Sequence, residues 1–419
     1  ITSKGAPYSL YAHAVSFALL TKENRQRFEL IEHEAYLFRY EDIPTEDFLP
    51  LIKTIDGRYA GKKIMYGAEA SNIYFGTGRT GSGKSWALAQ ILCSLFMLGH
   101  NVIVFDVSGS YTREKLCHML PQKVVDCLFR FIHIGEGLDK IPVDLGSLNG
   151  CNNLPDRKRL VYSILTAALG KLDQDKTSDQ QQRNALKAFL SSYLKDKTHR
   201  VDLAEVTEAI QHSNILKTQV TEALGLIVQE LEAIGSEPAT WDALFAKSNG
   251  IIVIDFGLEV GDSTHTLLDI MAASLFSWQM RHDQRFLSIA IDELADQNFS
   301  LHAPLSTIMT QGRKFHTALL GATQDYFNRG TLYLDGMKQA NIQSFCRPGQ
   351  SEDRVAQKLG YSNAIEAGFP TFKAGDTILA FDALNKETGE NDAIILRGRV
   401  VDFTETPLYE KFLREYGQE

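Results

Sequence analysis

Long hydrophobic runs, paired cysteines and an excess of positive charge are all absent from this sequence of 419 residues. No uninterrupted apolar stretch approaches the roughly 18 residues that a membrane-spanning helix needs, so we expect no membrane insertion. The five cysteines are scattered and odd in number and include no C-x-x-C pair, which favours reduced thiols in a cytoplasmic protein over a disulfide or zinc framework. The net charge of −9 argues against a protein coated in positive charge, but Lys and Arg can still gather on one nucleic-acid-binding surface.

The sequence also has no H-x-x-x-H pattern among its eleven histidines, and we identify no nuclease cluster. The chain begins with Ile1 rather than Met, so we expect it to be part of a longer polypeptide.

Two parts of the chain carry the pattern of a parallel sheet covered by helices on both faces. In each part, β-branched runs such as "NVIVFDV" and "GIIVIDFGL" alternate with helical stretches. The sequence between them is amphipathic and helical. We therefore predict an α/β fold with a mostly parallel central sheet and an α-helical insertion. The predicted segments are an N-terminal flank or small module over 1–60, the first part of the core over 61–150, the insertion over 151–247 and the second part of the core over 248–419.

Individual elements follow from the periodicity of apolar residues. In the flank, "HEAYLFRYEDIP" is typical of a strand, and "TEDFLPLIKTI" (45–55) is typical of a helix. A core helix is expected from Lys84 until Gly99 ends it. We expect core strands over 101–107, 128–134, 250–258, 286–293 and 317–324.

The stretch "FGTGRTGSGKSWALAQIL" (75–92) fits two phosphate-binding patterns at once. Gly76, Gly78 and Gly81 make G-x-G-x-x-G, the dinucleotide loop, and Asp106 follows at about the distance expected for a ribose ligand. This interpretation leaves the Gly-Lys-Ser that follows the loop without a role.

The alternative pattern, G-x-x-x-x-G-K-S, uses every one of these residues and predicts a nucleoside triphosphate. Glycines let successive backbone N–H groups point into one anion-sized cavity, and the helix that follows adds its positive end. Lys84 would neutralise charge on the β- and γ-phosphates, and Ser85 would supply a hydroxyl to Mg²⁺. The predicted phosphate-binding residues are Gly78, Arg79, Thr80, Gly81, Ser82, Gly83, Lys84 and Ser85. We favour this interpretation, with ATP and Mg²⁺ as the ligands.

A triphosphate site also needs an acidic residue at the end of another buried strand. "LSIAIDE" provides Asp292, which would hold the Mg²⁺ shell, and Glu293, which would orient or deprotonate the attacking water. Asp255 in "VIDF" is a rival for the magnesium-binding acid, although no second acid stands beside it. Asp106 either caps the turn through "SGS" or helps to bind Mg²⁺ or nucleotide, and we favour the structural role.

Two later positions complete the predicted site. Gln324 ends the strand "TALLGATQ", where an amide could contact both the γ-phosphate and the attacking water. Arg313 and Lys314 follow a predicted helix, so they either satisfy the helix dipole or reach the γ-phosphate of a neighbouring subunit as an arginine finger. His316 is expected to be a packed residue at the start of a strand.

The order of these motifs resembles the HerA/FtsK superfamily of DNA-pumping ATPases. The segments that carry the resemblance are "GRTGSGKS", "VIVFDVSGSY", "IIVIDFG", "SIAIDE", "GRKFHTALLGATQ" and "ANIQSFCRPGQSEDRVAQKLG". The resemblance spans 62–401, although 151–247 contributes little. It implies a RecA-like P-loop NTPase fold, ATP binding by Gly78 to Ser85, Asp292 and Glu293 as the magnesium-binding and catalytic acids, Gln324 as γ-phosphate sensor and Arg313 as a finger across a subunit interface.

The resemblance also implies a homo-hexameric ring around double-stranded DNA that hydrolyses ATP at subunit boundaries. Within the superfamily, "GAEASNIYFGTG" is similar to HerA-like enzymes that work with nucleases in end resection or antiphage defence, including large restriction proteins that respond to phosphorothioate-modified DNA. "VFDVSGSY" is also similar to the conjugative type IV secretion ATPases. We therefore expect an ATP-driven DNA translocase or helicase with nuclease or restriction partners. The alternatives are a secretion or conjugation ATPase and an NTP-regulated switch with little turnover, against which Glu293 argues.

Overall fold

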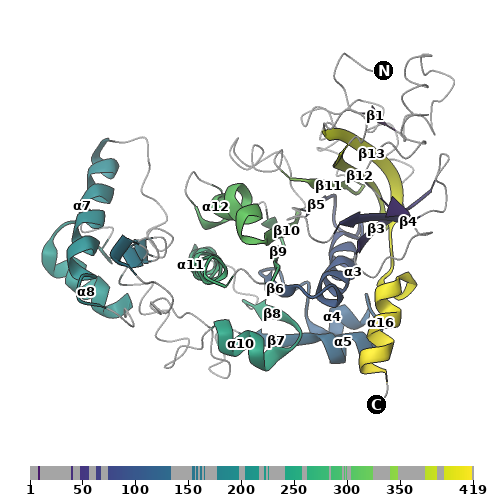
Figure 1. The fold of residues 1–419 in the computed structure, drawn as a ribbon, viewed down its shortest axis with the longest axis horizontal. Coiled ribbons are helices and arrows are strands. Elements are labelled where there is room, and N and C mark those ends of the chain that lie inside the picture. Colours follow the sequence, from purple (N-terminus) through teal and green to yellow (C-terminus); the bar gives the residue numbers. More distant parts are fainter. Residues whose placement is uncertain are drawn as a thin grey trace.

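A 13-stranded sheet with helices on both of its faces is the main element of the computed structural model (Figure 1). The structure describes residues 8–9, 39–40, 48–55, 63–67, 74–133, 153–155, 157–158, 161–162, 165, 177–197, 203–216, 221–222, 225, 241–256, 262–282, 285–294, 297, 299, 303–323, 340–347, 373–384 and 391–417. The strands are β1 (Tyr8–Ser9), β2 (Arg39–Tyr40), β3 (Phe48–Thr54), β4 (Lys63–Gly67), β5 (Tyr74–Thr77), β6 (Asn101–Asp106), β7 (Phe129–His133), β8 (Ile251–Asp255), β9 (Leu287–Ile291), β10 (Thr317–Thr323), β11 (Ile342–Phe345), β12 (Asp376–Leu384) and β13 (Asn391–Val400).

The strand order is β2-β4-β3-β13-β12-β11-β5-β10-β9-β6-β8-β7, with β1 paired to β13. From β11 to β7 every neighbouring pair is parallel, and from β11 through β12, β13, β3 and β4 to β2 every pair is antiparallel. The carboxyl ends of β5, β10, β9, β6 and β8 therefore meet along one edge of the sheet. This arrangement confirms the predicted α/β fold with a mostly parallel core.

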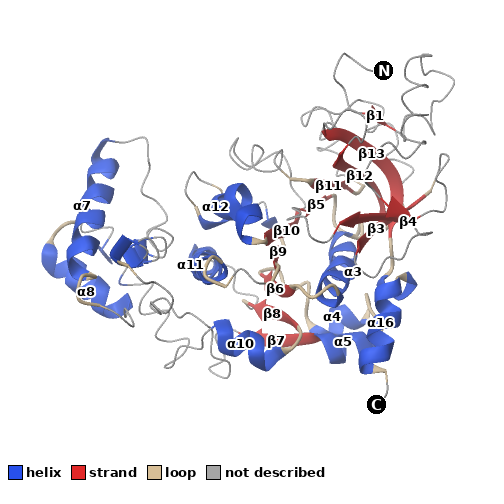
Figure 2. Cartoon of the chain, viewed as in Figure 1, coloured by secondary structure: helices blue, strands red, loops and turns tan. Residues whose placement is uncertain are grey.

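Helices cover both faces of the parallel strands (Figure 2). The described helices are α3 (Lys84–Met97), α4 (Arg113–Cys117), α5 (Gln122–Leu128), α7 (Thr177–Tyr193), α8 (Leu203–Ser213), α10 (Trp241–Ser248), α11 (Asp262–Gln279), α12 (Pro304–Gln311) and α16 (Pro407–Tyr416), with 3₁₀ turns η3 (Gly312–Phe315) and η6 (Phe403–Glu405). In Figure 2, α3, α4, α5 and α16 lie on one side of the parallel strands, and α10, α11 and α12 lie on the other.

Two hydrophobic cores result, one on each face. Along β6, Val102 and Val104 belong to the core beneath α3, whereas Ile103 and Phe105 belong to the core beneath α11. This alternation is the period of two that a strand imposes on its side chains. A strand buried on both faces must be apolar at almost every position, which explains the continuous β-branched runs in the sequence.

Helix α3 follows the predicted course. It begins directly after the glycine loop, and most of its residues are buried because it packs between the sheet and α16. Gly99 ends it with a left-handed φ of 92°, and the N–H of Gly99 donates to the carbonyl of Phe96.

The segment 45–55 was predicted to be helical, and that prediction was wrong, because Phe48–Thr54 forms β3. This strand pairs antiparallel with both β4 and β13. Leu49 and Leu51 are buried while Lys53 is exposed. The apolar pattern of this segment is compatible with a helix or a strand, and pairing with β4 and β13 makes it a strand.

The predicted helical insertion contains α7 and α8, which Figure 1 shows set apart from the sheet at the left. Much of 151–247 lies outside the described residues, and the domain boundaries at 60, 150 and 247 stay predictions. In the part of the chain that the structure describes, no helix is long and apolar enough to cross a membrane, and His, Cys, Asp and Glu form no group of three suited to a metal ion. The four described cysteines are free, Cys93 and Cys346 in the interior and Cys117 exposed.

Candidate nucleotide-binding site

The glycine loop lies between the end of β5 and the start of α3, as the phosphate-binding interpretation requires. Gly83 precedes the helix with a φ of 96°, a backbone conformation that residues with a Cβ rarely adopt. A Cβ on Gly83 would lie 2.7 Å from the backbone nitrogen of Gly375, so this position also needs glycine for space. At Gly78 a Cβ would lie 2.7 Å from the Ser82 Oγ.

Backbone hydrogen bonds hold the loop in place from two neighbouring strands. The N–H of Gly78 donates to the carbonyl of Thr323 (3.3 Å), at the end of β10. The N–H of Arg79 donates to the carbonyl of Arg347 (2.9 Å), just past β11. The N–H of Gly375 donates to the carbonyl of Ser82 (3.1 Å). The loop is therefore fixed on three sides by parts of the chain far away in sequence.

The loop residues fit a phosphate group. Lys84 is 8% exposed, and its Nζ donates to the carbonyls of Gly78 (2.6 Å) and Arg79 (3.2 Å), so a positive charge is held inside the loop. The buried Ser82 Oγ has no hydrogen-bond partner among the described residues. No side chain caps the N-terminus of α3, which leaves its first amides facing the loop as donors for an anion.

The acid pair lies at the same edge of the sheet as the loop. Asp292 and Glu293 directly follow β9, which is separated from β5 by β10 alone. Neighbouring strands are about 4.8 Å apart, so β5 and β9 lie about 10 Å apart. Register places Phe75, Gly321 and Ile291 in one row, which brings both strand ends to the same height.

Thr323 connects the two halves of this site. Its carbonyl accepts from the Gly78 N–H, and its Oγ1 donates to Glu293 Oε1 (3.3 Å). Glu293 has a left-handed φ of 53°, which is costly for a residue with a side chain and often marks a functional position. A second hydroxyl, that of Ser108, hydrogen-bonds Asp292 Oδ2. Each acid of the pair is thus held by a hydroxyl from an adjacent strand end.

Asp106 has the structural role that the sequence favoured. Its carboxylate accepts from the backbone N–H groups of Ser110 and Tyr111, both at 2.8 Å, and so fixes the turn that carries Ser108. Burial raises the pKa of Asp106 to about 6, and those two amide donors partly oppose the rise while the carboxylates of Asp292 and Asp255 add to it.

Asp255, the rival acid, ends β8. This strand is four positions from β5 in the sheet, about 19 Å, whereas β9 is two positions away. The Asp255 carboxylate lies 3.1 Å from His133 Nδ1. The strand order therefore favours Asp292 over Asp255 as the partner of the loop.

Arg313 and Lys314 are not brought to this edge. Arg313 and Lys314 are exposed in η3, which precedes β10, so they lie at the opposite edge of the sheet from Thr323. Gln324 lies outside the described residues. His316 is exposed with a φ of 51° and makes an edge-to-face contact with Phe286, so it borders the strand rather than packing inside it.

The sequence analysis missed Thr323 and Ser108, the two hydroxyls that contact the acid pair. Both stood within motifs that were noted, "ATQ" and "VSGS", at the ends of predicted strands. Polar residues at the carboxyl ends of strands next to an acid-bearing strand are the signal that could have identified them.

Comparison with known proteins agrees with this geometry. Residues 77–264 match the family model described as "Helicase HerA, central domain". VirB4 of Thermoanaerobacter pseudethanolicus has a similar structure, with a TM-score of 0.56 and 15% identity, over 88% of this chain and 99% of that chain. The bacterial conjugative coupling protein TrwBdeltaN70, in a trigonal form with sulphate, has a TM-score of 0.53 and 13% identity, over 81% of this chain and 88% of that chain.

A further similar structure is plasmid coupling protein TrwB in complex with ADP and Mg²⁺, with a TM-score of 0.51, 13% identity, and the same coverage of 81% and 88%. Among curated proteins, none matches the sequence significantly. The fold is that of a RecA-like P-loop NTPase, and residues 77–264, slightly less than half of the chain, are similar to the central domain of the HerA helicase family.

Proposed function

We propose that this protein is a cytoplasmic, ATP-driven DNA translocase or helicase of HerA type. The observation that carries the proposal is the pairing of the glycine loop with the acid pair at one sheet edge, linked through Thr323. A loop that only bound nucleotide would not need Glu293 held beside it in a costly backbone conformation.

Different residues at this edge of the sheet would bind the phosphates, hold Mg²⁺ and activate the attacking water. Gly78 to Ser85 would bind the triphosphate, with the Lys84 ammonium facing the β- and γ-phosphates. Ser85 and Asp292 would hold Mg²⁺, which would supply further positive charge to the phosphate oxygens. Glu293 would take a proton from the attacking water as the water oxygen bonds to the γ-phosphorus; the bond from that phosphorus to the β–γ bridging oxygen breaks, and ADP and inorganic phosphate leave. Gln324, which follows β10 directly, remains the proposed γ-phosphate sensor.

Arg313 enters the proposal as a residue that acts on another subunit. β10 has seven residues, so about 20 Å of strand separates its two ends. Within one chain, Arg313 precedes the far end of β10 from the acid pair. We propose that the chain forms a homo-hexameric ring in which Arg313 reaches a neighbour's γ-phosphate.

Mixing experiments test this arrangement. Inactive Arg313→Ala subunits mixed with wild-type subunits should lower the ATPase rate more steeply than their fraction, because each wild-type site would need a wild-type neighbour. Lys314→Ala, one residue away and also exposed, serves as the control. A loss strictly proportional to the mutant fraction would show that subunits act alone.

The ATPase rate with and without duplex DNA, over a salt series, tests the proposed function itself. We expect DNA to stimulate turnover and salt to weaken the stimulation steeply, since binding would rest on phosphate contacts. Glu293→Gln should abolish hydrolysis but keep ATP binding, whereas Glu114→Gln, an exposed change on α4, should alter neither. Loss of ATP binding in Glu293→Gln would contradict the assigned role.

A secretion or conjugation ATPase is the second candidate. The similar solved structures are, by their titles, VirB4 and a bacterial conjugative coupling protein, and they share the fold with this chain. Turnover that is high without DNA and indifferent to it would favour this candidate. The motifs that resemble HerA-like enzymes support the first candidate instead, with a nuclease or an antiphage restriction system as its partner.

A further inference from the structure

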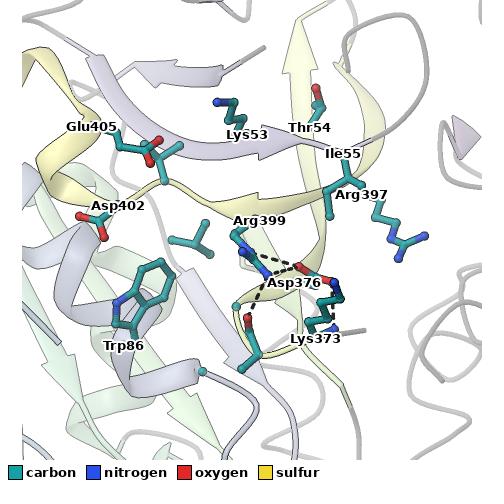
Figure 3. A pocket seen from close by; sticks show the side chains of 15 residues that line it. Lys53, Thr54, Ile55, Trp86, Lys373, Asp376, Arg397, Arg399, Asp402 and Glu405 are labelled. Atoms are coloured by element: carbon teal, nitrogen blue, oxygen red, sulfur yellow. Dashed lines mark hydrogen bonds and ion pairs between the residues drawn. The ribbon is translucent and has the colours of Figure 1, made fainter. Parts of the chain in front are cut away.

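A cavity of about 750 Å³ lies directly beside the glycine loop (Figure 3). Its size is within the range of pockets that bind small molecules, about 300–1,000 Å³. Gly83 and Trp86 from the start of α3 form one wall. The turn that leads into β12 (373–376), the last residues of β13, the end of β3 with Ile55, and residues 401, 402 and 405 complete the lining.

The cavity is continuous with the loop. The turn before β12 rests on the loop through the Gly375 N–H, which donates to the carbonyl of Ser82. Their approach is so close that a Cβ on Gly83 would lie 2.7 Å from the Gly375 nitrogen. The cavity therefore begins where the phosphate-binding loop ends, on the side of the loop away from the acid pair and β9.

Two flat side chains lie close to this turn. A Cβ on Gly375 would lie 3.6 Å from Trp86 Cζ3 and 3.8 Å from Arg399 Nε, so both the indole and the guanidinium approach this glycine. Trp86 is only partly buried against the core. Figure 3 shows both side chains at the pocket, with Arg399 bound to Asp376.

The guanidinium is fixed in its orientation. Arg399 Nη2 lies 3.2 Å from Asp376 Oδ1, and the Asp376 carboxylate is itself held by the Lys373 N–H at 2.9 Å. An indole and an oriented guanidinium are the groups on which purine and pyrimidine bases stack. Four cationic side chains (Lys53, Lys373, Arg397 and Arg399) and three carboxylates (Asp376, Asp402 and Glu405) line the cavity, and this near balance of charge suits an uncharged base and ribose.

We propose that this cavity binds the nucleobase and ribose of the nucleotide whose phosphates the glycine loop holds, with Trp86 as the stacking residue. The inference rests on the proposed function, because it needs a triphosphate in the loop. It goes further by naming a side chain and a space for the nucleoside that no motif in the sequence identifies.

Comparing two ligands tests the proposal. Mg²⁺-ATP would occupy both loop and cavity, whereas inorganic tripolyphosphate with Mg²⁺ would occupy the loop alone. In calorimetry, Trp86→Ala should weaken ATP binding about tenfold or more and change tripolyphosphate binding less than twofold, as expected for the loss of one stacked base. Trp86→Phe, which keeps an aromatic face, should restore most of the ATP affinity.

A fluorescence measurement on wild-type protein stays informative even where Trp86→Ala fails to fold. ATP should change the tryptophan emission, tripolyphosphate should not, and the change should vanish in Trp86→Phe, which retains Trp241 and Trp278 as an internal background. Equal weakening of both ligands, or no weakening of either, would overturn the proposal, as would an unchanged emission when ATP is bound. If wild-type protein binds neither ligand, the proposed function fails together with this inference.

Discussion

Replacing Thr323 with Val removes the hydroxyl that holds the proposed catalytic acid while keeping the backbone contact to the loop. Thr323 is 1% exposed, and its Oγ1 donates to Glu293 Oε1 over 3.3 Å. Hydrogen bonds to charged groups contribute about 1.5–3 kcal/mol. Because 3.3 Å is long for an O–H···O bond, we take the lower end, about 1.5 kcal/mol, which corresponds to about a tenfold fall in kcat.

The assay is steady-state ATP hydrolysis at saturating nucleotide, with ATP affinity measured separately. We expect Thr323→Val to lower kcat and leave the dissociation constant nearly unchanged, because the Gly78 N–H still donates to the residue 323 carbonyl. Thr323→Ser keeps the hydroxyl and loses only a methyl group, so it should recover most of the rate.

A double-mutant cycle sharpens this test. In a Glu293→Gln background the carboxylate is gone, so adding Thr323→Val should have little further effect on the residual rate. The reasoning is refuted if Thr323→Val weakens ATP binding as much as it lowers kcat. It is also refuted if the serine variant is as slow as the valine variant, because the hydroxyl would then have no separate role.

Three further predictions concern stability and the loop. Because the pKa of Asp106 is about 6 in the folded protein against an ordinary 3.8, the folded state binds this proton more tightly. The free energy of unfolding should therefore fall by about 3 kcal/mol as pH rises from about 4 to 6 and then level off; Asp106→Asn should remove that slope in denaturant titrations. Gly83→Ala should lower the Tm and abolish tripolyphosphate binding by calorimetry, since its Cβ would displace Gly375. Gln90→Leu should cost about 2–4 kcal/mol in urea unfolding, because the buried N–H of Phe403 and the partly buried carbonyl of Met119 lose their partner.

Local patterns were enough to predict much of the fold. The glycine loop, the helix after it and the buried strands depend on residues close together in sequence, and their positions are confirmed. β3 was missed because its pairing with β13 joins residues near 53 to residues near 399, which no local pattern records. A short apolar segment has no fixed secondary structure until such a partner is present.

The candidate site likewise combines features that local sequence patterns predict with features that depend on tertiary neighbours. Asp292 and Glu293 were predictable because acids at strand ends next to a glycine loop form a recognisable chemical pair. The contact of Thr323 with Glu293 and the position of Trp86 beside the cavity depend on which strands and turns become neighbours, so they were found only in the structure. The strand order, which places β10 between β5 and β9, is a tertiary result and decides between Asp292 and Asp255.

Strand order also gives three aspartates at one edge of the sheet different positions relative to the glycine loop. Asp255 is too far from β5 to share a phosphate with the loop, and Asp106 lies one strand closer. Asp106 does not face the loop; both its oxygens accept from the turn after β6, and that turn carries Ser108 to Asp292. Asp106 therefore influences the site indirectly, through the turn that carries Ser108. Its burial raises its pKa and costs stability, and its two hydrogen bonds fix the turn from which the Ser108 hydroxyl contacts Asp292.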